Sequence, residues 1–310
     1  PRTPDAESVQ AVEAGLAGLS DPLAFAAAAT EAGLALWAGE PMMHGPRGDR
    51  DAALAEGAAA LAAAGHYLPG VFAFGGECFW GVDRFPDLLD RLQPFRRGEQ
   101  DLPARLMESE ATGDCGGATL SFFLSFRSPY TWLAAARVRA LAERWKARLV
   151  LRPVLPMVMR GLPVPPAKQM YIVRDCMREA MRMGIPFGRV CDPVGPGVER
   201  GLAVLHRATA LGRGPDFVES FLMGAFAEAV DATTDSGLLL MAERAGLTAA
   251  DVAAALAEDD WRAEAEANRA ALFDMGLWGV PSFQVADRPG HWGQDRLWAV
   301  EADLRAEAGA

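Results

Sequence analysis

The stretch TLSFFLSFRSPYTWLA, residues 119–134, joins an apolar run to the start of a helix. Residues 119–126 are β-prone and lie between a pair of glycines and a serine-proline step, which is typical of a buried strand. Ser128 can cap the following helix, and Pro129 suits its first turn, where a missing N–H costs nothing. Apolar residues then recur at helical spacing as far as Trp145. The stretch therefore predicts a strand followed directly by a serine-capped helix.

The elements after this helix indicate the fold class. Residues 148–153 alternate as a second strand, so strand, helix and strand form a βαβ unit. A long helical region follows, and we expect it to be an insertion over about residues 160–262. Residues 280–285 and 289–292 then favour a hairpin, and residues 295–306 favour a closing helix. The predicted architecture is α/β, with the order βαβ, helical insertion, ββα.

A repeated motif indicates how the chain is divided. The pattern W-G-x-D-R occurs at residues 80–84 and again at 292–296, each time after a Gly- and Pro-containing segment and before a helical tail. The repeat predicts a partial, degenerate first copy in residues 1–95 and a complete domain in residues 118–310. Residues 96–117 are charged and Gly-rich, and we interpret them as a linker.

The first copy begins in the middle of the repeated pattern. We expect the chain to be a piece of a longer tandem protein, because a half-domain would leave sheet edges and apolar surface uncovered. The alternative is a copy that has lost its front half. This copy has no counterpart of Ser128, and Gly57 stands where the second copy has Asn268. We therefore expect it to be inactive and to act as a packing partner.

Composition excludes several classes of function. The formal net charge of -11 over 310 residues argues against binding nucleic acid, which requires Lys and Arg to neutralise phosphates. No stretch is long and apolar enough to span a membrane, and no leader pattern opens the chain, so we expect a cytoplasmic protein. The four cysteines show neither CxxC nor zinc-ligand spacing. We expect free thiols and no metal site.

Several motifs, in their order and spacing, resemble the 2-hydroxychromene-2-carboxylate isomerases, glutathione-dependent relatives of the kappa-class glutathione transferases and of the DsbA oxidoreductases. The motifs are Ser128-Pro129-Tyr130, Lys168-x2-Tyr171-x3-Asp175, Gly184-x-Pro186-Phe187, Asn268, GVPSF at 279–283 and WGQDR at 292–296. The resemblance covers residues 120 to about 304 well and residues 1–92 weakly. It implies a thioredoxin-like fold with an inserted α-helical subdomain, and glutathione-dependent isomerisation of a conjugated aromatic acid.

The resemblance also implies a glutathione site. Ser128 would stabilise the glutathione thiolate at a helix N-terminus, where partial positive charge favours anions; a serine cannot itself form a disulfide. The residues alone also allow a simple helix cap. The Val280–Pro281 bond would be cis, and the Val280 backbone would pair with the cysteinyl part of glutathione. Asp295 would bind the γ-glutamyl ammonium, with Gln294 near the carboxylate.

Four further residues are weaker candidates. The resemblance brings Tyr130, Lys168 and Asn268 toward the substrate or glutathione, although Lys168 also fits a solvated helix face. Arg127 would either lower the sulfur pKa and attract an acidic substrate, or face water. The implied partners are a small aromatic molecule and either a second copy in a homodimer or the first repeat in an intrachain pseudo-dimer.

Two other functions stay open at this point. One is a thiol-disulfide oxidoreductase of DsbA type, which the lack of CxxC disfavours. The other is a non-catalytic thioredoxin-like scaffold that binds a partner through its cleft.

Overall fold

The computed structural model describes residues 3–40, 48–95 and 104–309. The chain divides into two compact units, Pro1–Gly81 and Val82–Ala310, called unit 1 and unit 2 below. The division falls earlier than the predicted domain end at residue 95. The reason is that residues after Gly81, Arg84 above all, form ion pairs with side chains of unit 2.

The described residues of unit 1 form three helices and a hairpin. Its elements are α1 (Ala6–Ala17), α2 (Pro22–Ala38), α3 (Arg50–Ala63), β1 (Val71–Phe74) and β2 (Glu77–Trp80). The strands β1 and β2 pair antiparallel, and Phe79 of β2 is fully buried. Each helix begins after an aspartate whose carboxylate accepts a hydrogen bond from a first-turn N–H, which stabilises the helix start; these caps are Asp5, Asp21 and Asp49.

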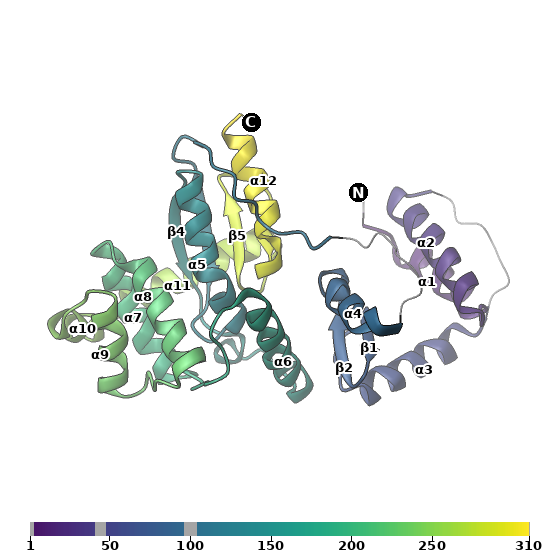
Figure 1. Ribbon diagram of the computed structural model, residues 1–310, viewed down its shortest axis with the longest axis horizontal. Helices are drawn as coiled ribbons and strands as arrows, with labels where there is room; N and C mark the ends of the chain where they lie inside the picture. The colour runs from purple at the N-terminus through teal and green to yellow at the C-terminus, as the bar shows by residue number, and fades with distance from the viewer. Residues whose placement is uncertain (1–2, 41–47, 96–103, 310) are drawn as a thin grey trace. The chain divides into compact units, whose positions relative to one another are not determined.

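Unit 2 is built on a four-stranded sheet with the order β4-β3-β5-β6. The strands are β3 (Thr119–Leu124), β4 (Arg148–Pro153), β5 (Ser282–Val285) and β6 (His291–Trp292). Strands β3 and β4 are parallel, and β5 and β6 are antiparallel to their neighbours. Helix α5 (Pro129–Arg144) connects the parallel pair (Figure 1). The predicted βαβ unit is confirmed.

Helices fill the chain between β4 and β5, where the sequence predicts an insertion over about residues 160–262, and the last of them continues to Asp274. They are η3 (Met157–Arg160), α6 (Pro166–Met183), α7 (Pro196–Ala210), α8 (Gly214–Met223), the π-helical η4 (Gly224–Glu228), α9 (Asp235–Arg244), α10 (Ala249–Leu256) and α11 (Asp260–Asp274). Helix α6 ends at Gly184, which adopts a left-handed conformation. Figure 1 shows α7 to α10 grouped together beside α5.

Aromatic packing joins the sheet to these helices. Phe122 of β3 stacks on Phe283 of β5 with ring centroids 5.4 Å apart. Phe126, just after β3, stacks on Phe221 of α8 at 4.0 Å and meets Phe217 edge-on. Burying each such ring contributes about 1.5–3 kcal/mol to the free energy of unfolding. The packing fixes the end of β3, and with it the start of α5.

The segment before β3 is attached to unit 2. Ser109 donates two hydrogen bonds to Glu301, and the Gly113 and Cys115 N–H groups donate to the carbonyls of Arg144 and Trp145 at the end of α5. The later part of the predicted linker is thus held by specific contacts. Residues 96–103 lie outside the described residues.

Both W-G-x-D-R motifs occupy the same place in the order of elements. The first follows the β1–β2 hairpin and leads into η1 (Val82–Arg84), α4 (Phe85–Leu92) and η2 (Gln93–Phe95). The second follows β5–β6 and leads into η5 (Gln294–Arg296) and α12 (Leu297–Glu307). This order agrees with the predicted repeat, whose origin as a degenerate copy stays a prediction. Within the described residues, no helix combines the length and apolar character needed to cross a bilayer.

Candidate functional site

Ser128 stands at the head of α5 and faces the loop before β5. Its Oγ accepts a hydrogen bond from the Thr131 N–H at 3.2 Å, which is the predicted cap, and its hydroxyl donates to the Val280 carbonyl at 3.4 Å. The Val280–Pro281 peptide bond is cis, as the resemblance implies. The Pro281 carbonyl accepts from the Gly293 N–H at 2.9 Å. These contacts tie the serine, the proline loop and the start of the second W-G-x-D-R motif together.

A hydroxyl, not a thiol, is present at this helix start. The chain's four cysteines, Cys78, Cys115, Cys176 and Cys191, all lie in the described ranges, and none of them is joined in a disulfide. Cys176 is fully buried in α6, and burial raises its pKa, so it is not a reactive thiolate. The partial positive charge at the start of α5 favours an anion brought by a ligand.

Next to this region, a buried arginine connects the two W-G-x-D-R motifs. The Arg84 guanidinium donates to both carboxylate oxygens of Asp175, at 2.8 Å from Nε and from Nη2, and its Nη1 donates to Asp295 at 3.0 Å. The Asp175 side chain is only 1% exposed and the Arg84 side chain 6% exposed. Burial alone would lower the pKa of Arg84, but the surrounding carboxylates, Asp175 above all, outweigh it and raise the pKa well above the ordinary value.

Glu179 is a second buried carboxylate in the same network. It accepts hydrogen bonds from Gln294 Nε2 at 3.0 Å, Arg182 Nη2 at 2.8 Å and Arg105 Nη1 at 3.4 Å. Burial would raise the pKa of Glu179, but three neighbouring arginines outweigh burial and lower it. They are Arg182, Arg84 and Arg105. The other end of the Gln294 amide accepts from Arg137 at 2.5 Å. Gln294 is therefore held at both ends of its side chain.

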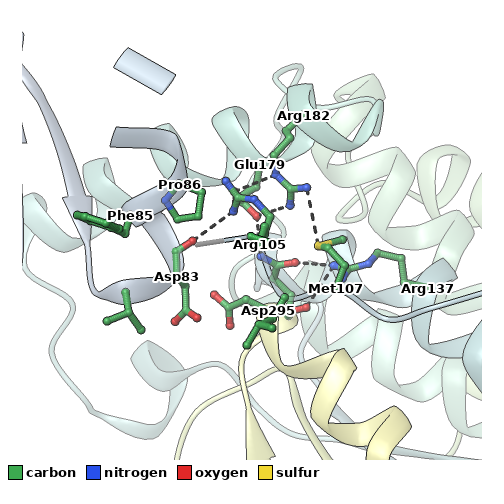
Figure 2. Close-up of a pocket in the computed structure, with 13 residues that line it drawn as sticks. Asp83, Phe85, Pro86, Arg105, Met107, Arg137, Glu179, Arg182 and Asp295 are labelled. Atoms are coloured by element: carbon green, nitrogen blue, oxygen red, sulfur yellow. Dashed lines mark hydrogen bonds and ion pairs between the residues drawn. The ribbon is translucent and has the colours of Figure 1, made fainter. Parts of the chain in front are cut away.

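A cavity of about 330 Å³ opens between these groups. Its walls come from η1 and α4, residues 104–107, α5, α6 and η5. Figure 2 shows side chains of both charges gathered around it, namely Asp83, Arg105, Arg137, Glu179, Arg182 and Asp295. Carboxylates can accept from an ammonium group, and guanidinium groups bind carboxylates. The lining suits a ligand end that carries both charges.

The two motifs exchange ion pairs through Asp83 and Asp295, which line this cavity. Arg84 of the first motif pairs with Asp295 of the second, and Arg296 of the second pairs with Asp83 of the first at 2.8 Å from Nη2. Each arginine thus binds the aspartate that precedes the other arginine. Reciprocal contacts of this kind are typical of an interface between two equivalent surfaces related by a two-fold axis.

The weaker predicted residues lie in different surroundings. The Tyr130 hydroxyl donates to Asp175 at 2.7 Å. Burial raises the pKa of Tyr130, and the Asp175 charge raises it further. Asn268 is 2% exposed and donates to the Pro153 carbonyl at 3.1 Å, so its amide holds α11 against the end of β4. Lys168 Nζ lies 5.4 Å from the centre of the Trp278 ring.

Arg127 is paired. Its Nε and Nη2 donate to the two carboxylate oxygens of Asp192 at 2.8 and 2.7 Å. The bidentate pair offsets the positive charge that was expected either to act on a sulfur or to face water.

Arg84, Glu179 and Arg137 are site residues that the sequence did not single out. The signal for Arg84 was the repeated W-G-x-D-R motif, which marks it as the counterpart of Arg296. No local pattern indicated Glu179 or Arg137, because their partners are distant in the sequence.

A serine-headed helix that faces a cis-proline loop, on a βαβ–ββα sheet with inserted helices, defines a protein of the thioredoxin-like class. Residues 119–305 match the family described as the DSBA-like thioredoxin domain. Since the match spans more than half of the chain, the chain belongs to this family.

A solved structure agrees with this chain at the level of the fold. A 2-hydroxychromene-2-carboxylate isomerase is similar to this chain with a TM-score of 0.52 and 20% identity, over 61% of this chain and 95% of the other. The cytosolic disulfide reductase DsbM from Pseudomonas aeruginosa has a TM-score of 0.47 and 21% identity, over 61% and 95%. A comparison with curated protein sequences gave no match.

Proposed function

We propose that this chain is a glutathione-dependent isomerase that acts on a conjugated aromatic acid. The observation that carries the proposal is the Ser128 hydroxyl, which stands at the start of α5 and donates to the carbonyl before cis-Pro281. A hydroxyl there can stabilise a sulfur anion that a ligand brings. It cannot form the mixed disulfide that thiol-disulfide exchange requires. The arrangement therefore favours glutathione as cofactor over an oxidoreductase role.

The two ends of the site match the two functional parts of glutathione. The backbone at Val280 would pair with the cysteinyl residue, in the manner of an added strand. The γ-glutamyl end, with its ammonium and carboxylate, would enter the cavity beside Asp295 and Gln294. In that position its ammonium would share Asp295 with Arg84, and its carboxylate would meet the arginines of the opposite wall.

The proposed reaction is an isomerisation, so substrate and product contain the same atoms. The cyclic acid opens: its ring C–O bond breaks as the hydroxyl on the same carbon becomes a carbonyl, and the hydroxyl proton passes to the released phenol oxygen. The glutathione thiolate adds to the conjugated double bond and forms one C–S bond, which converts the double bond to a single bond and leaves the displaced electron pair in an enolate. The single bond rotates, and the thiolate leaves with the electron pair of the C–S bond. Ser128 and the helix N-terminus would lower the thiol pKa, and the site would hold the reactants in position.

We also propose that the first W-G-x-D-R motif takes the place of a second copy. The reciprocal pairs Arg84–Asp295 and Arg296–Asp83 support an intrachain pseudo-dimer around the cavity. The proposed reaction needs reduced glutathione, which fits a cytoplasmic enzyme.

The test is an isomerisation assay on 2-hydroxychromene-2-carboxylate, with and without glutathione. We expect turnover only with glutathione, and a fall in kcat of about 100-fold or more in Ser128→Ala, the effect typical of losing a donor to a developing anion. Ser236→Ala, which changes an exposed serine, is the matched control. Glutathione-independent turnover, or an indifferent Ser128→Ala variant, would refute the proposal. Robust insulin reduction would instead favour disulfide chemistry.

A further inference from the structure

Two partly exposed indoles flank the loop that leads to cis-Pro281. Trp278 is 40% and Trp292 41% exposed, and their ring centroids lie 4.8 Å apart at an angle of 57°. Trp292 lies directly against Gly279, where an added Cβ would fall 2.5 Å from the indole ring. Glycine at this position therefore lets the Trp292 ring approach the loop. The loop then continues to Val280, whose carbonyl accepts from the Ser128 hydroxyl.

Two cationic side chains adjoin Trp278. Lys168 Nζ lies 5.4 Å from the centre of its ring, and Arg160 Nη2 donates to its carbonyl at 3.4 Å. Trp278 precedes Val280 by two residues, and two residues of chain span at most about 7 Å. The cations and the Ser128 hydroxyl therefore border the same short piece of backbone.

The Arg160 charge lacks a paired carboxylate among the described residues. Its Nε and Nη1 are buried and have no hydrogen-bond partner there. Burial lowers the pKa of Arg160 most, and repulsion from Arg269 lowers it further. The nearby Glu266 carboxylate is bound to Arg269 at 2.5 Å. Arg160 is half-buried as a whole, and buried guanidinium nitrogens left without a hydrogen-bond partner are unusual in a folded protein. A bound anion beside Trp278 would supply that charge.

We propose that Trp278, Trp292, Lys168 and Arg160 form the site for the aromatic carboxylate of the substrate. The ring of the acid would pack on the indoles, and its carboxylate would lie by the two cations. A conjugated bond next to the ring would then lie toward Val280 and a sulfur held at Ser128. This assignment deepens the proposed function and rests on it. It narrows the expected role of Lys168 from substrate or glutathione to the substrate carboxylate.

The test compares trans-cinnamate with its uncharged counterpart cinnamamide, by calorimetric titration of the full chain. We expect Lys168→Met and Arg160→Met each to weaken cinnamate binding at least tenfold while cinnamamide binding stays within twofold. Trp278→Ala should weaken both ligands. Arg262→Met, which removes an exposed arginine stacked 4.3 Å over Trp261, is the matched control and should change neither. Equal affinity of the native chain for the two probes, or Lys168→Met and Arg160→Met variants that both keep native cinnamate affinity, would overturn the assignment.

A parallel titration with glutathione separates this assignment from the proposed function. We expect Ser128→Ala to weaken glutathione and not cinnamate, and Lys168→Met to do the reverse. If cinnamate binds as expected but glutathione does not bind, the proposed function fails and the aromatic-acid site stands. If glutathione binds and supports turnover while the native chain binds cinnamate and cinnamamide equally, this assignment alone fails.

Discussion

Replacing Arg84 by methionine would remove the cation that binds one buried carboxylate, Asp175, and one partly exposed carboxylate, Asp295. Arg84 makes three charge-assisted hydrogen bonds of 3.0 Å or less to Asp175 and one to Asp295. Removing one partner of a buried ion pair typically costs about 3–5 kcal/mol, because the remaining charge stays desolvated. Asp175 keeps Arg178 and Tyr130 as donors, so we expect the lower end, about 3 kcal/mol. For a unit of this size that lowers Tm by about 6–12 °C.

The loss of stability in Arg84→Met should be larger at neutral pH than at acidic pH. Burial acts to raise the pKa of Asp175, but Arg84 and the other donors outweigh it and hold the folded-state pKa below its usual value. Its contribution to stability is therefore fully present above the unfolded pKa of about 3.9, and is lost as pH falls through the folded value. Without Arg84 the folded pKa rises and this contribution shrinks. The Arg84→Met deficit should be largest near pH 7 and diminish below about pH 4.

Urea denaturation followed by tryptophan fluorescence measures this effect, because most of the tryptophans lie in unit 2. Arg262→Met is the control: its arginine is 51% exposed, and exposed pairs contribute at most about 1 kcal/mol. A free energy of unfolding that Arg84→Met leaves unchanged at pH 7, or a deficit that is the same at pH 7 and pH 3.5, would refute the reasoning.

Three further outcomes follow from the site. Gly279→Ala should displace the Trp292 ring and lower the free energy of unfolding by about 1–3 kcal/mol. It should also weaken binding of both cinnamate and cinnamamide in calorimetric titrations, and unchanged affinities would contradict the close approach of Trp292 to Gly279. Asp83→Arg and Arg296→Asp should each destabilise unit 2 in urea titrations, and the double variant should recover most of the loss; purely additive effects would show that the pair is not coupled. Ser128→Cys should form a mixed disulfide with oxidised glutathione, detectable by mass spectrometry, whereas an unmodified cysteine would mean that glutathione does not reach α5.

The fold brings only some of the predicted site residues together. Ser128 and cis-Pro281 meet as the resemblance implies, and Asp295 lies in the cavity wall. Asn268 was expected near a ligand, but its amide is used to hold α11 to the end of β4. Arg127 was expected to act on a sulfur or to face water, and its guanidinium is bound to Asp192. A polar residue's partner depends on which distant element packs beside it, and spacing along the chain does not report this.

The sequence by itself determined the local elements of unit 2. The strand expected over residues 119–126 forms over residues 119–124, Ser128 caps α5 with Pro129 in its first turn, and β4 spans the expected residues 148–153. These features rest on side-chain alternation, capping and proline geometry, which act over a few residues and can be read from the chain.

Only the tertiary structure decided the ion network and the cavity. Arg84 binds Asp175 and Asp295, which follow it by 91 and 211 residues. The repeated motif showed that Arg84 and Arg296 are equivalent positions, but not that each arginine pairs with the other motif's aspartate. Such pairs form because burial makes an unpaired charge costly, and burial is a property of the folded chain.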